Sequence, residues 1–185
     1  MINESNEAQR KEREKIVMEK VKEEDMIAQE QLEGVKEWVW DLLITEKKFR
    51  PEEIKIDPQF SLKLSDCEAM VSIDYVINLN SISFMVVKCS SAAIESWERY
   101  IKAFARVVRN YQIPYAMVTD GENAKIFDMI SGSVIGTSVH ELFNRQEALD
   151  KIKDFIKIPF PPEKLEREKR IAYAFEGIKC PAVKQ

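Results

Sequence analysis

Two consecutive apolar segments constrain the fold of this chain most strongly. The first runs from Met70 to Asn78 and the second from Phe84 to Cys89, and both are rich in β-branched and aromatic residues. Such residues favour β-strands, and the three residues 79–81 suffice for a hairpin loop because asparagine tolerates the left-handed backbone conformation. Within these runs stand one acid, Asp74, and one base, Lys88. We therefore expect two buried central strands that carry one acid and one base.

The relative position of Asp74 and Lys88 depends on the strand register. Side chains alternate between faces, so Asp74 lies on the face opposite to Tyr75, and Lys88 shares a face with Val86. A three-residue loop at 79–81 would place Asp74 opposite Val86 and diagonal to Lys88. A loop shifted by one position would place Asp74 opposite Lys88, and a register of the other parity would separate them onto different faces. The sequence leaves these alternatives open.

Periodic patterns elsewhere predict an α/β fold. Apolar residues at steps of three and four predict helices, and short apolar runs bounded by turn residues predict strands. The predicted helices are 32–43, 92–110, 145–156 and 162–177, and the further predicted strands are 54–56, 60–64, 114–119, 124–130 and 133–136. The strand–helix–strand unit from 86 to 119 should be a right-handed crossover with parallel strands. This order predicts a mixed β-sheet flanked by helices.

Length and charge suggest how the chain is organised. Its 185 residues suit one domain with helical extensions: a charged helical arm at 1–28, a central domain at 29–158 and a helical tail at 159–185. A formal net charge of -4 disfavours a protein devoted to non-specific nucleic-acid binding. A local basic surface could still contact phosphates, because only the electrostatic field at the contact matters.

The cysteines and the apolar runs indicate the compartment. Cys67, Cys89 and Cys180 are widely spaced and form no CxxC pair, so neither a disulfide framework nor a zinc site is indicated. Cys89, beside Lys88, could have a lowered thiol pKa. The N-terminal residues lack the layout of a signal peptide, and no apolar run approaches the length of about 20 residues that crosses a bilayer. We therefore expect a cytoplasmic protein without a membrane segment.

Two charged helical segments each have two interpretations. The arm carries a thin apolar line of Val17, Val21 and Met18, which suits a solvated helix or a helix–helix contact with a protein partner or a second copy. Along 92–110, basic residues recur at steps of three and four opposite an apolar stripe. This pattern suits a solvated face or a surface that follows the phosphate backbone of DNA. The basic residues are Arg99, Lys102, Arg106 and Arg109.

Four short motifs occur in an order that is typical of one nuclease-like family. They are Glu33-Gly34-Val35-Lys36-Glu37, Asp74-Tyr75-Val76-Ile77, Met85-Val86-Val87-Lys88 and, after a long helix, Thr119-Asp120-Gly121. On these motifs, the segment 33–127 resembles the N-terminal domain of the type I restriction enzyme R subunit. The resemblance covers about half of the chain. It implies a restriction-endonuclease-like fold of the PD-(D/E)XK superfamily.

The resemblance also implies a site for Mg²⁺-dependent cleavage of DNA. Asp74 would bind the metal together with the backbone carbonyl of Val87, Lys88 would be the catalytic lysine, and Glu33 would be a further acid. Mg²⁺ prefers carboxylate and carbonyl oxygens. When bound, it acidifies water and neutralises charge in the transition state.

One position departs from the family pattern. Val86 stands two residues before Lys88, where the family has an acid, so a metal would need another oxygen, for which Glu95 is a candidate. Without a metal, Asp74 and Lys88 form only a cross-strand ion pair. Three functions follow: a catalytically impaired nuclease-like module that binds DNA or a protein, which Val86 favours; an active Mg²⁺-dependent DNA endonuclease with a rearranged acidic site; and a structural partner that oligomerises through the arm.

Overall fold

Helices and strands alternate in an order close to the predicted one. The computed structural model describes the backbone of residues 2–179 and the side chains of residues 10–176. The helices are α1 (Ile2–Asp41), α2 (Glu95–Val107), α3 (Arg145–Lys153) and α4 (Pro162–Lys179). The strands are β1 (Ile54–Ile56), β2 (Gln59–Lys63), β3 (Glu68–Ser72), β4 (Tyr75–Leu79), β5 (Ile82–Cys89), β6 (Tyr115–Thr119), β7 (Ala124–Asp128) and β8 (Val134–Gly136). The predicted α/β fold is confirmed.

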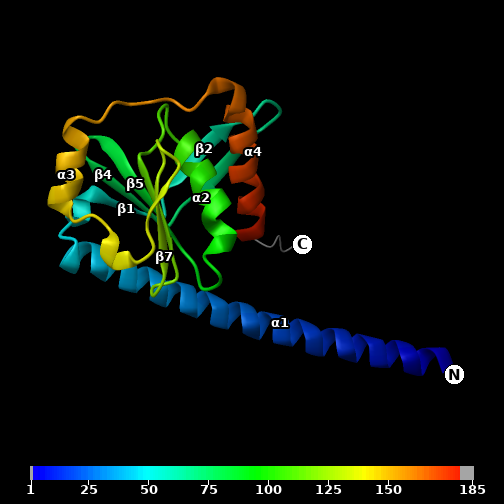
Figure 1. The fold of residues 1–185 in the computed structure, drawn as a ribbon. Helices are drawn as coiled ribbons and strands as arrows, with labels where there is room; N and C mark the ends of the chain where they lie inside the picture. Colours follow the sequence, from blue (N-terminus) through cyan, green and yellow to red (C-terminus); the bar gives the residue numbers. More distant parts are fainter. Residues whose placement is uncertain (1, 180–185) are drawn as a thin grey trace.

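A mixed six-stranded sheet forms the centre of the molecule. Its strand order is β1-β4-β5-β6-β7-β8, while β2 and β3 form a separate two-stranded sheet. Only β5 and β6 run parallel, and α2 connects them, as the predicted crossover requires. In Figure 1, α2 and α4 lie side by side on one side of the central strands, and α3 lies on the other.

The sheet separates two apolar clusters. The first lies on the side of α2 and α4 and includes Val76, Val86, Phe104 and Ala172. The second cluster lies on the side of α3 and the end of α1, and its members include Tyr75, Val87, Val39 and Ile152. Because both faces of β4 and β5 are covered, these strands are apolar at nearly every position.

The predicted continuous strand from Met70 to Asn78 is wrong. The chain bends at Ile73 and Asp74, so β3 pairs with β2, whereas β4 pairs with β1 and β5. At the bend, the Asp57 N–H donates a hydrogen bond to the Asp74 carbonyl oxygen at 2.8 Å. The Asp74 carboxylate accepts a hydrogen bond from the backbone of β5, which holds the bend against the central sheet. Asp74 therefore precedes β4 instead of lying within a strand.

A tight turn and a β-bulge set the register of β4 against β5. Asn80 and Ser81 have positive φ angles of 48° and 66°, which suits a two-residue hairpin loop. The register shifts between Ile77 and Asn78, so that Phe84 on β5 is the extra residue of a bulge. Beyond it, Val76 pairs with Val86 and Tyr75 with Val87. The three-residue-loop register, with Asp74 opposite Val86, is wrong.

The C-terminal helix α4 packs on α2 through a buried carboxylate. Glu168 is 5% exposed, and it binds Arg99 and, at 3.0 Å, Arg106. The solvated face predicted for the helix 92–110 is therefore corrected, because Arg99 and Arg106, two of its four basic residues, bind Glu168 of α4. Burial by itself would raise the pKa of Glu168, but the hydrogen bonds from the two arginines outweigh it and hold the pKa below its ordinary value of 4.5.

We expect the free energy of unfolding to depend less on pH in the acidic range when Glu168 is changed to Gln (Glu168→Gln). A carboxyl group whose pKa is lowered by folding stabilises the fold above its unfolded pKa, and this stabilisation is lost as the pH falls through the lowered folded pKa. The free energy of unfolding, measured by urea denaturation from neutral pH to below 4.5, should fall less steeply in Glu168→Gln than in the native chain. Glu163→Gln, an exposed change on the same helix, is the control. Equal slopes in all three proteins would contradict the assignment.

Candidate functional site

Asp74 and Lys88 form a buried ion pair at the carboxyl end of β5. The Lys88 Nζ lies 2.7 Å from the Asp74 Oδ2, and the backbone N–H of Cys89 donates to the same oxygen at 2.6 Å. The two residues are 8% and 5% exposed. Extending the β4–β5 pairing by one position places Asp74 opposite Lys88, which was one of the sequence alternatives. The bulge and the bend together bring these side chains into contact.

An aromatic ring lies on the other side of the Lys88 ammonium group. The Nζ lies 5.0 Å from the ring centroid of Trp97, in the first turn of α2. A cation over an aromatic face is attracted by the ring quadrupole, and the attraction is stronger where water is excluded. Lys88 is thus held between a carboxylate and an indole ring, and its ammonium group faces little solvent.

Val86 lies inside the apolar core. It is 0% exposed and pairs with Val76 on β4 and Ala116 on β6. It belongs to the cluster under α2, on the same face of β5 as Lys88. The position at which the family pattern has an acid is therefore filled by a well-packed side chain without polar atoms.

The other predicted acids bind elsewhere. The Glu33 carboxylate on α1 lies 3.6 Å from the Lys36 Nζ, which also binds Asp57 at 3.0 Å. Glu95 lies 3.6 Å from the Lys125 Nζ on β7. Among the described residues, no group of three or more His, Cys, Asp or Glu side chains could hold a metal ion. The fold brings Asp74 and Lys88 together but leaves Glu33 and Glu95 in other ion pairs.

Lys36 links the Glu33 region electrostatically to Asp74. Burial lowers the pKa of Lys36, but the hydrogen bond and charge of Asp57, with smaller contributions from Asp74 and Glu33, raise it overall. The Tyr75 hydroxyl donates to the Lys36 carbonyl oxygen at 2.8 Å, which joins α1 to the start of β4. Glu33 therefore pairs with Lys36, whereas Asp74 pairs with Lys88.

The residues present do not fit a Mg²⁺ ion in this arrangement. Asp74 is the single carboxylate of the group, and its Oδ2 already accepts two hydrogen bonds. Val87, the predicted carbonyl ligand, sits on β5 where that strand pairs with both neighbours. Mg²⁺ demands near-octahedral oxygen coordination, commonly with at least one or two carboxylates free to bind it. Lys88 occupies the space beside the one carboxylate available.

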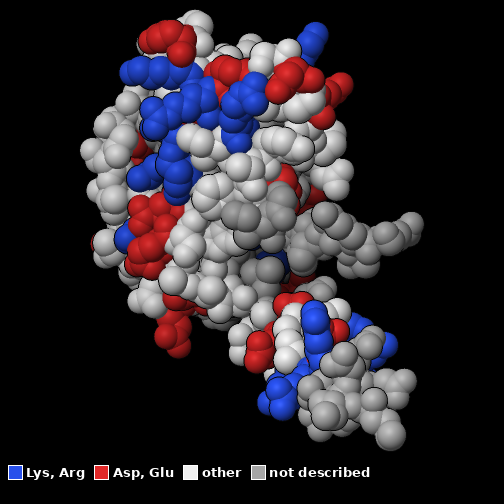
Figure 2. All heavy atoms as spheres, turned by 90° about the vertical axis from the view of Figure 1, so that its right-hand side faces the viewer, with Lys and Arg blue, Asp and Glu red and all other residues white. Residues whose placement is uncertain are grey.

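The predicted phosphate-contacting residues of α2, and Arg109 just beyond its end, make contacts within the protein. Lys102 Nζ lies 4.1 Å from the ring centroid of Phe127 and 3.8 Å from Glu98, and the Arg109 Nε donates to the Ser83 Oγ at 3.0 Å. Their side chains are nevertheless not fully buried. Figure 2 shows Lys and Arg side chains gathered over one part of the face on the α4 side, beside groups of Asp and Glu. A basic surface of limited extent is thus present on an acidic protein.

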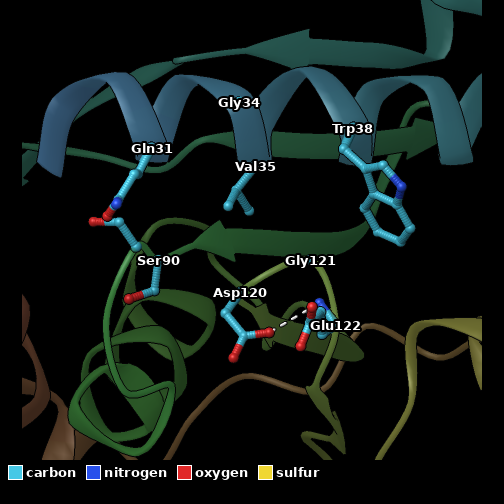
Figure 3. A pocket seen from close by; sticks show the side chains of 9 residues that line it. Gln31, Gly34, Val35, Trp38, Ser90, Asp120, Gly121 and Glu122 are labelled. Carbon is cyan, nitrogen blue, oxygen red and sulfur yellow. Dashed lines mark hydrogen bonds between the residues drawn. The ribbon is translucent and has the colours of Figure 1, made fainter. Parts of the chain in front are cut away.

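A pocket that the sequence did not reveal lies between α1 and two strand ends. Its volume is about 480 Å³. It is lined by Gln31, Gly34, Val35, Trp38, Ser90, Ser91, Asp120, Gly121 and Glu122 (Figure 3). Ser90 and Asp120 follow the parallel strands β5 and β6, and ligands of open α/β sheets commonly bind at such carboxyl ends. The only sequence signal was the turn at Asp120-Gly121, and Gly121 has a φ angle of 98°.

Of the two acids that line this pocket, Asp120 already accepts hydrogen bonds. The Asp120 Oδ1 accepts from the backbone N–H groups of Glu122 and Asn123, at 2.9 and 2.7 Å. Burial by itself would raise the pKa of Asp120, but the hydrogen bonds from Asn123 and Glu122 lower it overall. The carboxylate therefore shapes the turn between β6 and β7.

Cys89 is not an activated thiol. Its side chain is fully buried, and burial together with the negative charge of Asp74 raises the thiol pKa, although Lys88 partly opposes this. The expectation of a lowered pKa, drawn from the neighbouring lysine, is wrong because burial raises the thiol pKa and Asp74 balances the Lys88 charge.

The fold and the site define a class of protein: an α/β domain with an acid–lysine ion pair at the end of a strand. The chain matches the family described as "Type I restriction enzyme R protein N terminus" over residues 31–142, more than half of its length. It belongs to this family, as the motifs predicted. Comparison with curated proteins and with solved structures finds no match. None of the described helices is both long and apolar enough to cross a membrane.

The family match divides the molecule unevenly. It includes the last part of α1, the site residues, α2 and all eight strands. The outer part of α1, together with α3 and α4, lies outside it. The Glu168 contact with the basic residues of α2 is therefore made by a helix beyond the matched region.

Proposed function

We propose that this chain is a nuclease-like domain of the restriction R-subunit type that no longer hydrolyses DNA and acts as a DNA-binding module. The observation that carries the proposal is the closed ion pair of Asp74 and Lys88 beside the buried Val86. A metal-dependent nuclease needs a carboxylate free for the metal and a lysine free for the attacking water or the phosphate. Here each of the two groups is the other's partner.

Packing supports the loss of hydrolysis. A valine at position 86 gains stability from burial under α2, whereas an acid there would have to be desolvated. The pair of Asp74 and Lys88 then has a structural role, because it ties the bend before β4 to the end of β5. An active endonuclease with a rearranged acidic site would need an acid from elsewhere, and Glu33 and Glu95 both pair with other lysines.

Cleavage assays test this proposal directly. We expect no cutting of plasmid or single-stranded DNA by the native chain with Mg²⁺ or Mn²⁺. Cleavage that needs the metal and disappears in Asp74→Asn would overturn the proposal in favour of an active endonuclease. Cleavage that arises only in Val86→Glu would show that the missing acid by itself had disabled the site, which agrees with the proposal.

DNA binding through the basic surface of α2 is the second part of the proposal. Lys102 is the most informative residue, because it is partly exposed and does not bind Glu168. We expect Lys102→Gln to weaken binding to a duplex oligonucleotide, measured by fluorescence anisotropy over a series of salt concentrations. The slope of log K against log salt should fall in magnitude by about 0.9, the value for one lost phosphate contact.

The matched control for Lys102→Gln is Lys153→Gln on α3, a more exposed lysine on another helix. It should leave both the affinity and the slope unchanged. If the native chain binds no duplex, or if both variants lose affinity equally, the α2 surface is not the DNA contact.

A further inference from the structure

The outer part of α1 extends beyond the body of the protein. Every described side chain from Arg10 to Gln31 is exposed, whereas the end of the helix, around Val39, is buried in the second apolar cluster. Figure 1 shows this helix passing beneath the sheet and continuing well past it toward the N-terminus. At 1.5 Å per residue, the exposed length is about 30 Å. In the following, the arm means residues 10–31, the exposed part of α1 whose side chains the structure describes, and not the predicted segment 1–28.

The arm lacks the packing that usually stabilises a helix. Helical stability in proteins comes mainly from burial of an apolar face, and isolated helices are marginal in water. Its six large apolar side chains are all exposed: Ile16, Val17, Met18, Val21, Met26 and Ile27. A surface helix of this kind suggests a partner that covers one of its faces.

One line of these side chains continues the face that α1 buries. Val17, Val21 and Ala28 precede Leu32, Val35 and Val39 at successive steps of four, seven, four, three and four residues. Such steps keep side chains on one side of a helix. Leu32, Val35 and Val39 pack in the second apolar cluster. The same stripe therefore runs outward from the core, and Val17 and Val21 are 58% and 45% exposed on it.

The charges of the arm identify the partner. Residues 10–15 contain four basic and two acidic side chains, and residues 19–25 contain four acidic and two basic ones. A second arm in antiparallel orientation would place the basic segment of each copy beside the acidic segment of the other. A parallel second arm would place like charges together, which is unfavourable.

We propose that two copies of this chain associate through antiparallel pairing of their arms, with Val17 of one copy packed against Val21 of the other. Such a contact is self-complementary, so it closes as a two-fold dimer instead of growing into a filament. The proposal does not depend on DNA binding or on the state of the Asp74 site.

Sedimentation equilibrium of the full chain over a range of concentrations tests the association. We expect a monomer–dimer equilibrium that the double change Val17→Glu and Val21→Glu weakens by at least about tenfold, because it places charges in the apolar seam. Met26→Glu is the control, since Met26 is 64% exposed on the opposite side of the arm and its change should leave the dissociation constant unaltered. A monomer at every concentration, or equal losses in both variants, would overturn the proposal.

A charge exchange separates pairing from helix formation. Arg13→Glu with Lys15→Glu should weaken the dimer, and adding Glu23→Lys with Asp25→Lys to the same chain should restore it, because the complementarity is then reversed but intact. Circular dichroism of each variant records its helix content. Failure of the second pair of changes to restore association, with the helix content preserved, would contradict charge-guided pairing.

Disulfide cross-linking tests the orientation, in a background with Cys67→Ser and Cys180→Ser. Chains with Arg13→Cys and chains with Asp25→Cys should cross-link readily when mixed and poorly when each is alone. Efficient cross-linking within either single variant would indicate parallel arms and overturn the antiparallel arrangement.

Discussion

Asp74→Ala is expected to destabilise the protein by about 3–5 kcal/mol, the usual cost of leaving one member of a buried ion pair without its partner. Lys88 would then keep a charge in a site that is 5% exposed, with only the Trp97 ring beside it. The Cys89 N–H would also lose its acceptor. Urea denaturation followed by circular dichroism measures the change in the free energy of unfolding.

A double-mutant cycle isolates the contribution of this pair. The cycle consists of Asp74→Asn, Lys88→Met and their combination. Each single change should destabilise the fold because it leaves one buried charge without its partner, whereas the double variant should recover much of the loss, because the amide oxygen still accepts from the Cys89 N–H and no charge remains buried. Asp150→Ala is the surface control, since Asp150 and Lys153 pair at 2.5 Å with more than half of each side chain exposed. Its cost should stay below about 1 kcal/mol. A similarly small cost for Asp74→Ala would show that the site is solvated.

Val86→Glu is expected to lower the free energy of unfolding by about 3–5 kcal/mol at neutral pH, because the new carboxyl group must take up a proton when it is buried in the core. Burial raises the pKa of such a group above its unfolded value. The penalty is therefore small below the unfolded pKa and grows as the pH rises toward the folded one. The stability deficit of the variant, measured by urea denaturation, should shrink on acidification.

Val86→Gln is the matched control for this change. It has nearly the same shape as the glutamate variant but does not titrate, so its deficit should stay constant over the same pH range. A Val86→Glu protein as stable as the native chain at neutral pH would mean that the new carboxylate reaches solvent or the Lys88 ammonium group. Val86 would then lie at an accessible site and not within the core.

The sequence patterns predicted the elements well and the partners of the strands poorly. Alternation of apolar residues continues from Val71 through Ile73 to Tyr75, although β3 and β4 belong to different sheets. Periodicity reports only which side chains are buried: alternate positions are buried in β3, whereas nearly every position is buried in β4. The apolar pattern of a strand therefore does not indicate which other strand it pairs with.

The sequence indicated both members of the Asp74–Lys88 ion pair but not the contact between them. The motif order identified Asp74 and Lys88, and the family that contains them is confirmed. The contact between the two depends on the bulge at Phe84, which shifts the register by one residue and has no clear sequence signature. The separate locations of Glu33 and Glu95 depend on Lys36 and Lys125, which lie on α1 and β7.

Contacts between residues far apart in sequence account for the remaining differences. Arg99 and Arg106 looked like a solvated stripe because Glu168, more than 60 positions away, bears no pattern that links it to them. The predicted boundary between the arm and the domain at 28/29 falls inside a single continuous helix, since α1 runs from Ile2 to Asp41. Helical periodicity marks where a face becomes apolar, and the helix itself need not end there.

Local chemistry was therefore enough to establish the α/β class, the parallel strand–helix–strand unit and the hairpin turn at Asn80. These features depend on alternation, turn propensity and residue identity, which are properties of short segments. The pairing of Asp74 with Lys88, the engagement of Glu168 and the exposure of the arm depend on which surfaces meet when the chain folds. Such long-range contacts bring together residues whose separation in sequence carries no periodic signal.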